Sequence, residues 1–235
     1  MECSKRLIAI ETTGRQGSVA TLAGEAGGAK LVAQIALTSD ERTAQALAPT
    51  LKKLLAETGW KPSSVELVAV AVGPGSFTGL RIGVTTAKTF AYAVGAEVIG
   101  VNTLEALAAQ APSKSPLWTV LDAQRQELFA AKFISGDDHR MHVDRQTRII
   151  AQDAWLAELH PGDHVIGTAL SRLAARLPVF VEPVSSDLWQ PMAAAVGSVA
   201  WQSYLTGQRD DLWKLAPQYY RASAAEEKAA KSMTI

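Results

Sequence analysis

A glycine-rich turn with the sequence GPGSFTG, residues 73–79, is the first place in this chain where chemistry could occur. It joins an apolar segment to a helical pattern, and the amides at the start of such a helix favour an anion such as a phosphate. The spacing fits neither nucleotide fingerprint, because a P-loop reads G-x-x-x-x-G-K-[ST] and a Rossmann loop reads G-x-G-x-x-G. The turn is therefore compatible with phosphate binding without indicating it. A strand-to-helix turn that simply needs glycine is the other interpretation.

Side chains that could catalyse a reaction are few and scattered. The one cysteine, Cys3, precedes the first apolar segment, and the four histidines lie in polar stretches of the second half without a zinc-binding spacing. His139 and His142 are three residues apart in an expected turn, which leaves a metal pair as an alternative. Glu11 and Asp122 could face a cleft, although isolated carboxylates at strand ends are common. We therefore expect no catalytic residue and no metal site in this chain.

The helix expected behind the turn, over about 79–95, has small residues at every fourth position. These residues are Gly79, Gly83, Ala87, Ala91 and Gly95. Such a ridge allows another element to pack very close to the helix, and a glycine inside a helix costs about 1 kcal/mol relative to alanine. Two interpretations stay open: tight packing onto the chain's own sheet, and an interface with another protein.

The composition is that of an ordinary globular protein, with 235 residues, of which 48% are hydrophobic and 20% are charged. The 23 basic and 23 acidic residues give zero formal net charge, which argues against a protein that grips nucleic acid alone. No segment approaches the ~18 consecutive apolar residues of a membrane span, and the start lacks the apolar core of a secretion signal. A single cysteine fits a reducing compartment. We expect a cytoplasmic protein with no membrane partner.

The elements that must position these residues alternate between strands and helices. Strands are expected over 6–13, 17–24, 29–38, 65–72 and 97–102, and helices over 39–58, 79–95 and 103–112. A second unit adds strands over 117–123, 127–135, 142–151, 163–169 and 178–183 and helices over 170–177 and 192–207. Pro49 should kink or divide the first helix. The pattern indicates two α/β lobes, over 1–103 and 104–215, followed by a tail over 216–235.

Four blocks of this sequence together resemble the TsaB (YeaZ) family of tRNA threonylcarbamoyladenosine biosynthesis proteins. They read AIETTGRQGSVATL, AVAVGPGSFTGLRIGVTTAKTFAYAVGAEVIGVNTLEALA, VLDAQRQELFAAKF and PQYYR. The segment GPGSFTGLRIG is the most specific match, and the blocks occur in the order that the family has. The resemblance is dense over about 6–110, patchy over 117–135 and faint over 136–215.

The resemblance implies a two-lobed actin/Hsp70/sugar-kinase-like (ASKHA) fold and an accessory role. Proteins of this family bind a paralogue, TsaD, through helices of the first lobe, and an ATPase, TsaE, joins the complex. TsaD transfers a threonylcarbamoyl group to adenine 37 of tRNAs that read ANN codons. The resemblance thus implies a non-catalytic scaffold subunit that activates TsaD and meets tRNA only through the complex. A homodimer is a further option for the isolated chain.

Two sets of residues would carry this function. The partner interface would use the helix over 41–58 and the ridge with its neighbours, namely Gly79, Arg81, Gly83, Val84, Ala87, Lys88 and Ala91. The border of a nucleotide cleft would use Thr12, Thr13, Gly75, Ser76, Phe77 and Thr78. The resemblance implies no cofactor of the chain's own, and it places any ATP or ADP at an interface shared with the partner.

Departures from the family pattern favour the non-catalytic interpretation. Where the family often has His-Ser-Glu in the first helix, this chain has Thr43-Ala44-Gln45. The Asp-x-Gly-Thr phosphate motif of active relatives is Glu11-Thr12-Thr13-Gly14 here, and the Asp-Ala-Arg turn of the family reads Asp122-Ala123-Gln124-Arg125. Three rival functions remain: an ATP-dependent small-molecule kinase of the same superfamily, a peptidase, and a homodimeric binding module with no role in tRNA modification.

Overall fold

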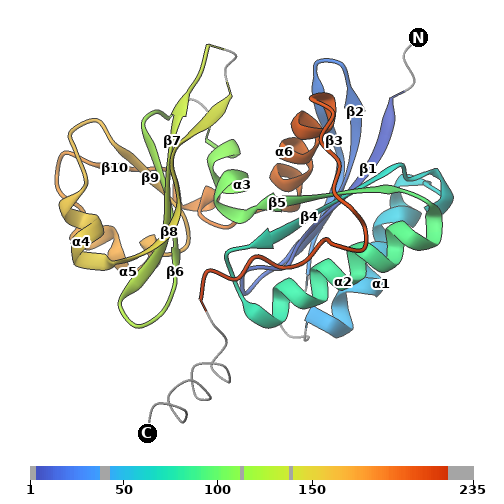
Figure 1. Ribbon diagram of the computed structural model, residues 1–235, viewed down its shortest axis with the longest axis horizontal. Coiled ribbons are helices and arrows are strands. Elements are labelled where there is room, and N and C mark those ends of the chain that lie inside the picture. The colour runs from blue at the N-terminus through green and yellow to red at the C-terminus, as the bar shows by residue number, and fades with distance from the viewer. Residues whose placement is uncertain (1–3, 38–42, 112–113, 138–139, 222–235) are drawn as a thin grey trace, which may run out of the picture.

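The computed structural model describes residues 4–37, 43–111, 114–137 and 140–221, which form two lobes, each built on a five-stranded sheet (Figure 1). The strand orders are β3-β2-β1-β4-β5 in the first sheet and β10-β9-β6-β7-β8 in the second. In each sheet, an antiparallel meander of three strands is extended by two parallel strands. The two sheets therefore share one topology, although the sequence shows no repeat. Two mixed sheets flanked by helices confirm the predicted two-lobed α/β fold of the ASKHA type.

The first sheet lies between two layers of helices. Its elements are β1 (Lys5–Glu11), β2 (Ser18–Glu25), β3 (Gly28–Ala36), α1 (Thr43–Thr58), β4 (Leu67–Gly73), α2 (Phe77–Val94), β5 (Glu97–Asn102) and α3 (Thr103–Ala109). β4 is buried along its whole length, as expected for a central strand that is apolar on both faces. Buried residues of α1 and α2 pack against one face of the sheet, and those of α6 (Ala193–Leu205) pack against the other.

The second lobe repeats the plan with shorter helices. Its elements are β6 (Leu117–Asp122), β7 (Glu127–Ser135), β8 (Met141–Ala151), α4 (Gln152–Ala157), β9 (His164–Ile166), α5 (Leu170–Leu173) and β10 (Glu182–Pro183). Expected strands over 163–169 and 178–183 are thus shorter than predicted, because only these few residues pair. The helix α4 was not predicted, since six residues are too short to show a period. Pro49 does not divide α1, which continues through it.

The lobes exchange a helix at their junction. α3 follows the last strand of the first sheet, yet Leu104 and Leu107 pack with Leu117 and Phe133 of the second. α6 follows the last strand of the second sheet and returns to the first, where it contacts β1, β2, β3 and β4. A helical pattern alone does not tell which sheet a helix covers. The boundary between the lobes at about residue 103 stays a prediction. α6 lies after that boundary in the sequence but packs on the first sheet.

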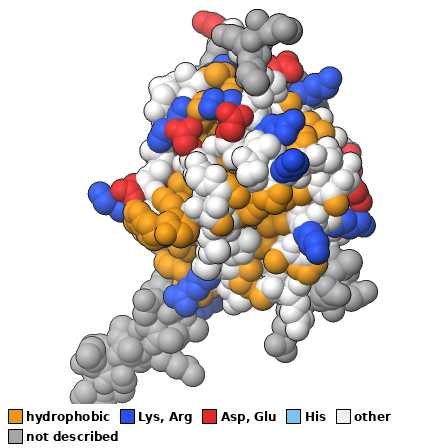
Figure 2. Space-filling model, turned by 90° about the vertical axis from the view of Figure 1, so that its right-hand side faces the viewer, with side chains coloured by type: hydrophobic (Ala, Val, Ile, Leu, Met, Phe, Trp, Pro, Cys, Tyr) orange, Lys and Arg blue, Asp and Glu red, His pale blue; other side chains and the backbone are white. Residues whose placement is uncertain are grey.

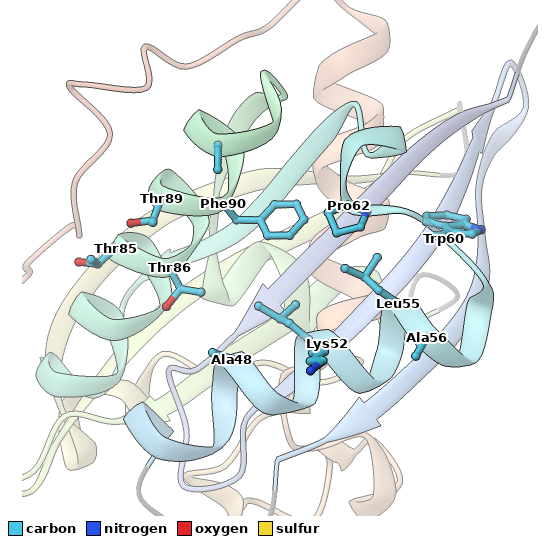
Figure 3. Close-up of a pocket in the computed structure, with 12 residues that line it drawn as sticks. Ala48, Lys52, Leu55, Ala56, Trp60, Pro62, Thr85, Thr86, Thr89 and Phe90 are labelled. Atoms are coloured by element: carbon cyan, nitrogen blue, oxygen red, sulfur yellow. The ribbon is translucent and has the colours of Figure 1, made fainter.

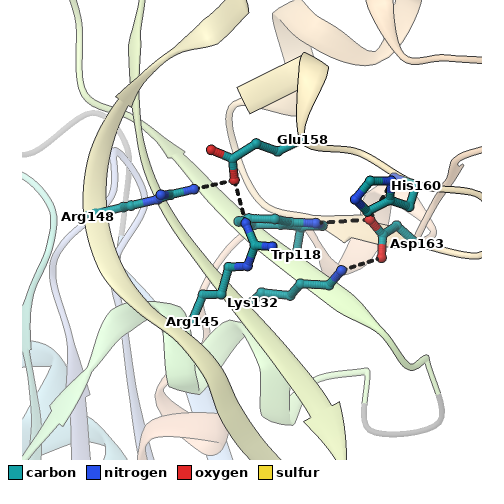
Figure 4. Close-up of polar contacts among 7 residues, drawn as sticks. All are labelled: Trp118, Lys132, Arg145, Arg148, Glu158, His160 and Asp163. Carbon is teal, nitrogen blue, oxygen red and sulfur yellow. Dashed lines mark hydrogen bonds and ion pairs between the residues drawn. The ribbon is translucent and has the colours of Figure 1, made fainter. Parts of the chain in front are cut away.

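A buried ion pair holds the loop after α4 to the second sheet (Figure 4). Lys132 Nζ lies 2.8 Å from an oxygen of Asp163, which is 2% exposed. The other carboxyl oxygen accepts hydrogen bonds from the Trp118 indole at 3.1 Å and the His160 amide at 3.0 Å. Burial alone would raise the pKa of Asp163, but the hydrogen bonds from Lys132, the His160 amide and Trp118 hold it below its usual value. This cluster is satisfied internally and stabilises the lobe.

Candidate docking site

The glycine turn packs against the end of β1, so its close contacts lie within the chain. The Ser76 amide donates to the Thr13 carbonyl at 2.8 Å, and Thr12 Oγ1 donates to the Gly79 carbonyl at 2.8 Å. Gly73 has a φ of 128°, a region that favours glycine, and a Cβ there would lie 2.6 Å from the carbonyl oxygen of Gln218. Packing therefore accounts for glycine in this turn without a bound phosphate.

The six residues expected beside a nucleotide differ in exposure. Thr12 and Thr13 are buried, Gly75 and Phe77 are half-buried, and Ser76 and Thr78 are exposed. Ser76 caps α2, because its hydroxyl accepts a hydrogen bond from the Gly79 amide at 3.3 Å. A nucleotide near these six residues stays a prediction.

The small-residue ridge of α2 faces the chain's own sheet, except for Gly95, which ends the helix and is exposed. Gly79, Gly83, Val84, Ala87 and Ala91 are all buried. A side chain at Gly79 would collide with the Thr12 backbone, and one at Gly83 would collide with Thr12 Oγ1. The expectation that these five residues form the partner interface is therefore corrected: the chain's own first lobe already occupies the space beside the ridge.

Arg81 and Lys88 lie on another flank of α2, where both bind residues 208–221, a segment that we call the strap. Arg81 Nε donates to the Tyr219 hydroxyl at 3.0 Å. Lys88 Nζ donates to the carbonyl oxygens of Trp213 at 3.0 Å and Leu215 at 2.9 Å. These two side chains, which we expected at a partner interface, fasten the strap to α2.

An open groove lies between α1 and α2 (Figure 3). Its volume is about 740 Å³, and among the described residues that line it Lys52 is the charged one. The remaining lining includes Ala48 and Ala56 on α1, Trp60 after it, and Thr85, Thr89 and Phe90 on α2. Figure 2 shows hydrophobic side chains gathered on this side of the molecule, with Lys and Arg side chains around them. An apolar groove between two helices is a shape that receives helices of a partner protein.

Glu11 ends β1 as a fully buried carboxyl group. Its Oε1 accepts hydrogen bonds from the Thr13 amide at 2.6 Å and from the Thr13 hydroxyl. Its Oε2 has no hydrogen-bond partner in the described parts of the chain. Burial raises the pKa of the Glu11 carboxyl to about 7, although the hydrogen bonds from Thr13 oppose this rise. The group is therefore turned into the protein and engaged by its own turn.

We expect the free energy of unfolding to fall by about 3 kcal/mol as the pH rises from about 4.5 to about 7, through Glu11 alone. The folded chain holds this proton more tightly than the unfolded chain, so the stability from protonated Glu11 is complete below pH 4.5 and lost above pH 7. Glu11→Gln has no proton to lose. Urea unfolding at several pH values in this range gives the free energy of unfolding of both proteins. Plotted against pH, this free energy should fall more steeply in the wild type than in Glu11→Gln, and parallel curves would contradict the assignment.

The other polar candidates do not join Glu11. Asp122 pairs with Arg172 at 3.1 Å and accepts a hydrogen bond from the Gln124 amide at 2.7 Å. Residues 4–37, 43–111, 114–137 and 140–221 contain no group of three or more His, Cys, Asp or Glu side chains placed to share a metal ion. Cys3 and His139 lie outside these residues. In the same stretches, none of the helices is long and apolar enough to span a bilayer.

Comparison with known proteins identifies relatives of this chain. The family model described as "TsaD: tRNA N6-adenosine threonylcarbamoyltransferase" matches residues 31–157, just over half of the chain. An uncharacterized protein of Mycobacterium tuberculosis is 35% identical over 101 residues, which are 43% of this chain and 47% of that protein. The tRNA threonylcarbamoyladenosine biosynthesis protein TsaB of Bacillus subtilis is 31% identical over 119 residues, 50% of this chain and 52% of that protein. The chain thus spans about half the length of these curated relatives.

Solved structures support the fold over a longer stretch. YeaZ from Pseudomonas aeruginosa superposes with a TM-score of 0.74 at 24% identity, covering 92% of this chain and 99% of that one. At this level of identity the likeness concerns the fold. It extends to the second lobe, where the sequence resemblance is faint.

Proposed function

This chain belongs to the TsaD family, as a member of its TsaB (YeaZ) type, and from that premise we propose that it serves the formation of threonylcarbamoyladenosine in tRNA as a docking subunit. It binds and activates a TsaD-type paralogue and does not transfer the group itself. The paralogue modifies adenine 37 of tRNAs that read ANN codons.

The observation that carries this proposal is the open groove between α1 and α2. The match to the TsaD family model covers both of these helices, so a TsaD-type protein has corresponding helices in its first lobe. Two proteins with the same helix pair can pack these pairs face to face, as two copies do across a two-fold axis. The small side chains of Ala48, Ala56, Thr85 and Thr89 leave room for the partner's helices to approach.

A role without group transfer is supported by the position of Glu11. The resemblance places the phosphate motif of active relatives at Glu11-Thr12-Thr13-Gly14. The carboxyl group there is buried and accepts two hydrogen bonds from Thr13. A carboxylate turned into its own loop is a poor ligand for the magnesium ion of a nucleotide, since such ions are held by exposed oxygens.

The other members of the assembly follow from the same premise. A TsaE-type ATPase joins the complex, and tRNA is held by the complex and not by this chain alone. ATP or ADP, if bound near the 73–79 loop, lies at an interface shared with the partner. We place the assembly in the cytoplasm.

Size-exclusion chromatography with light scattering tests the docking role. The samples are this chain, the TsaD-type paralogue from the same organism, and their mixture. We expect a new complex that contains both proteins, at concentrations where the chain alone is still monomeric. Separate elution of the two proteins would contradict the proposal, and self-association alone would assign the groove to a homodimer.

A further inference from the structure

The strap, residues 208–221, leaves α6, runs along the first lobe and ends at the second (Figure 1, the red segment). It is anchored early, because the Asp210 amide donates to the Val98 carbonyl at 3.1 Å and a carboxyl oxygen of Asp210 accepts from the Gly100 amide at 2.7 Å. Lys88 then binds two strap carbonyl groups, as described above. The strap thus follows β5 and α2 before it reaches the junction of the lobes.

The next strap residues bind the carboxyl end of β4 and the start of α2. The Gln218 amide donates to the Val72 carbonyl at 2.7 Å. The Tyr219 ring stacks on Phe77 with 4.4 Å between the ring centroids, and Arg81 lies over Phe77 at 4.1 Å. Ligands of open α/β sheets bind beyond the carboxyl ends of the strands. In this protein part of that region is filled by the strap.

The two lobes are joined by the last two described residues, Tyr220 and Arg221. The Tyr220 hydroxyl accepts a hydrogen bond at 3.0 Å from Asn102 at the end of β5, while its ring lies edge-on to Phe129 of β7 at 6.1 Å. Arg221 donates to the Ala123 carbonyl at 2.6 Å and forms an ion pair with Glu127. Tyr220 therefore touches both lobes, and Arg221 binds the turn between β6 and β7.

The turn between β6 and β7 has an unfavourable backbone conformation. Gln124, Arg125 and Gln126 have φ values of 61°, 53° and 59°, so three successive non-glycine residues are left-handed. Each such residue costs roughly 1–2 kcal/mol. The bonds from Arg221 to Ala123 and Glu127 grip the turn on both sides of these residues. The Ala123 carbonyl and the Glu127 carboxylate, one on each side of this costly turn, thus both accept from the Arg221 guanidinium group.

We propose that the junction of the lobes is a binding site for an extended peptide segment, that its ligand is the chain's own Gln218–Arg221, and that this bound segment fixes the angle between the lobes. The site is formed by Val72, Phe77, Asn102, Ala123, Glu127 and Phe129. The chemistry that it recognises is a pair of aromatic rings followed by an arginine. This inference goes beyond the docking function, which uses the groove on the other side of α2.

Pulsed electron paramagnetic resonance between the two lobes tests the proposal. Nitroxide labels are placed on Lys61→Cys in the first lobe and Ala154→Cys on α4 of the second, both exposed, in a chain that also has Cys3→Ser. The intact strap should give one narrow distance distribution. Tyr220→Ala combined with Arg221→Ala should make the distribution roughly twofold wider or shift it to longer distances, because the strap then no longer ties the second lobe to the first.

Trp213→Ala is the matched control, since this exposed strap residue has its ring contact with Tyr92 of the first lobe. It should leave the distribution unchanged. Milder variants are available if the double variant does not fold. Tyr220→Phe keeps the ring and loses the hydrogen bonds that the hydroxyl makes with Asn102 and Gln218, and Arg221→Lys keeps the charge. A folded strap variant with the wild-type distribution would overturn the proposal. Co-elution with the TsaD-type paralogue should persist in the double variant, so failure of one inference does not imply failure of the other.

Discussion

Ala48→Glu should weaken binding of this chain to a TsaD-type paralogue by roughly a hundredfold, which corresponds to about 3 kcal/mol. Ala48 is exposed on α1 and lines the groove between α1 and α2. A partner helix seated in the groove would bury the new carboxylate together with Lys52, the cation four residues along α1, and the cost of desolvating both charges exceeds what their pairing returns. Glutamate is a good helix former, so α1 itself should tolerate the change. Isothermal titration calorimetry measures the affinity.

Lys53→Glu provides the control for this variant. Lys53 is on the same helix and is two-thirds exposed, but it does not line the groove. The substitution changes the net charge by more than Ala48→Glu does, so a general electrostatic effect would be larger here. We expect affinity within a few-fold of the wild type. Equal losses in the two variants, or none in Ala48→Glu, would contradict docking through the groove.

Gly83→Leu should lower the free energy of unfolding by more than about 3 kcal/mol and reduce the yield of soluble protein. Gly83 is buried against Thr12 Oγ1 and Val70, so even a Cβ has no room. If the ridge were a free interface, this substitution would leave a folded monomer that fails only to bind its partner. Urea unfolding distinguishes the two expectations, because only an effect on folding moves the midpoint.

Gly95→Ala is the corresponding control at the end of the same helix. Gly95 has a left-handed φ of 74°, but nothing lies within 4 Å of the position that a Cβ would take. We expect a loss of about 1 kcal/mol, due to backbone conformation alone. Wild-type stability in Gly83→Leu would show that the packing of α2 on the first lobe has been assigned wrongly.

Most of the fold could be predicted from local pattern. The segments 65–72 and 97–102 are short and mostly apolar, and they form the parallel strands β4 and β5. The resemblance to TsaB (YeaZ), stated from four blocks of sequence, is confirmed by the relatives found. The failures are short elements. α4 has six residues and β10 has two, so both depend on tertiary contacts and not on a repeating pattern.

The sequence prediction put a partner interface on α1 and α2, but most of the residues that it named on α2 face the chain's own sheet. Small residues at every fourth position indicate that something packs closely, but not whether it is a partner or the chain's own strand. No apolar stripe in the sequence marks the α2 side of the groove, which is lined by Thr85, Thr89 and Ala93. The groove exists only because α1 lies beside α2 on the same sheet.

The contacts of the strap could not be predicted from local sequence either, because they join residues that are still farther apart in the chain. The letters PQYYR were visible as a family block, but the partners of Tyr219 and Tyr220 lie more than one hundred residues earlier, at Arg81 and Asn102. Nothing in the local sequence predicts which distant residues receive these hydroxyl groups. The three left-handed residues of the turn at 124–126 were equally hidden, since none is glycine.

Reconstitution of the tRNA modification tests the central claim most directly. The TsaD-type paralogue, the TsaE-type ATPase and the enzyme that supplies the threonylcarbamoyl adenylate, all from the same organism, are combined with unmodified tRNA, ATP, threonine and bicarbonate. Threonylcarbamoyladenosine is then quantified by mass spectrometry with and without this chain. The docking account predicts modification only when the chain is present, and little with Ala48→Glu. Equal modification without the chain would contradict it.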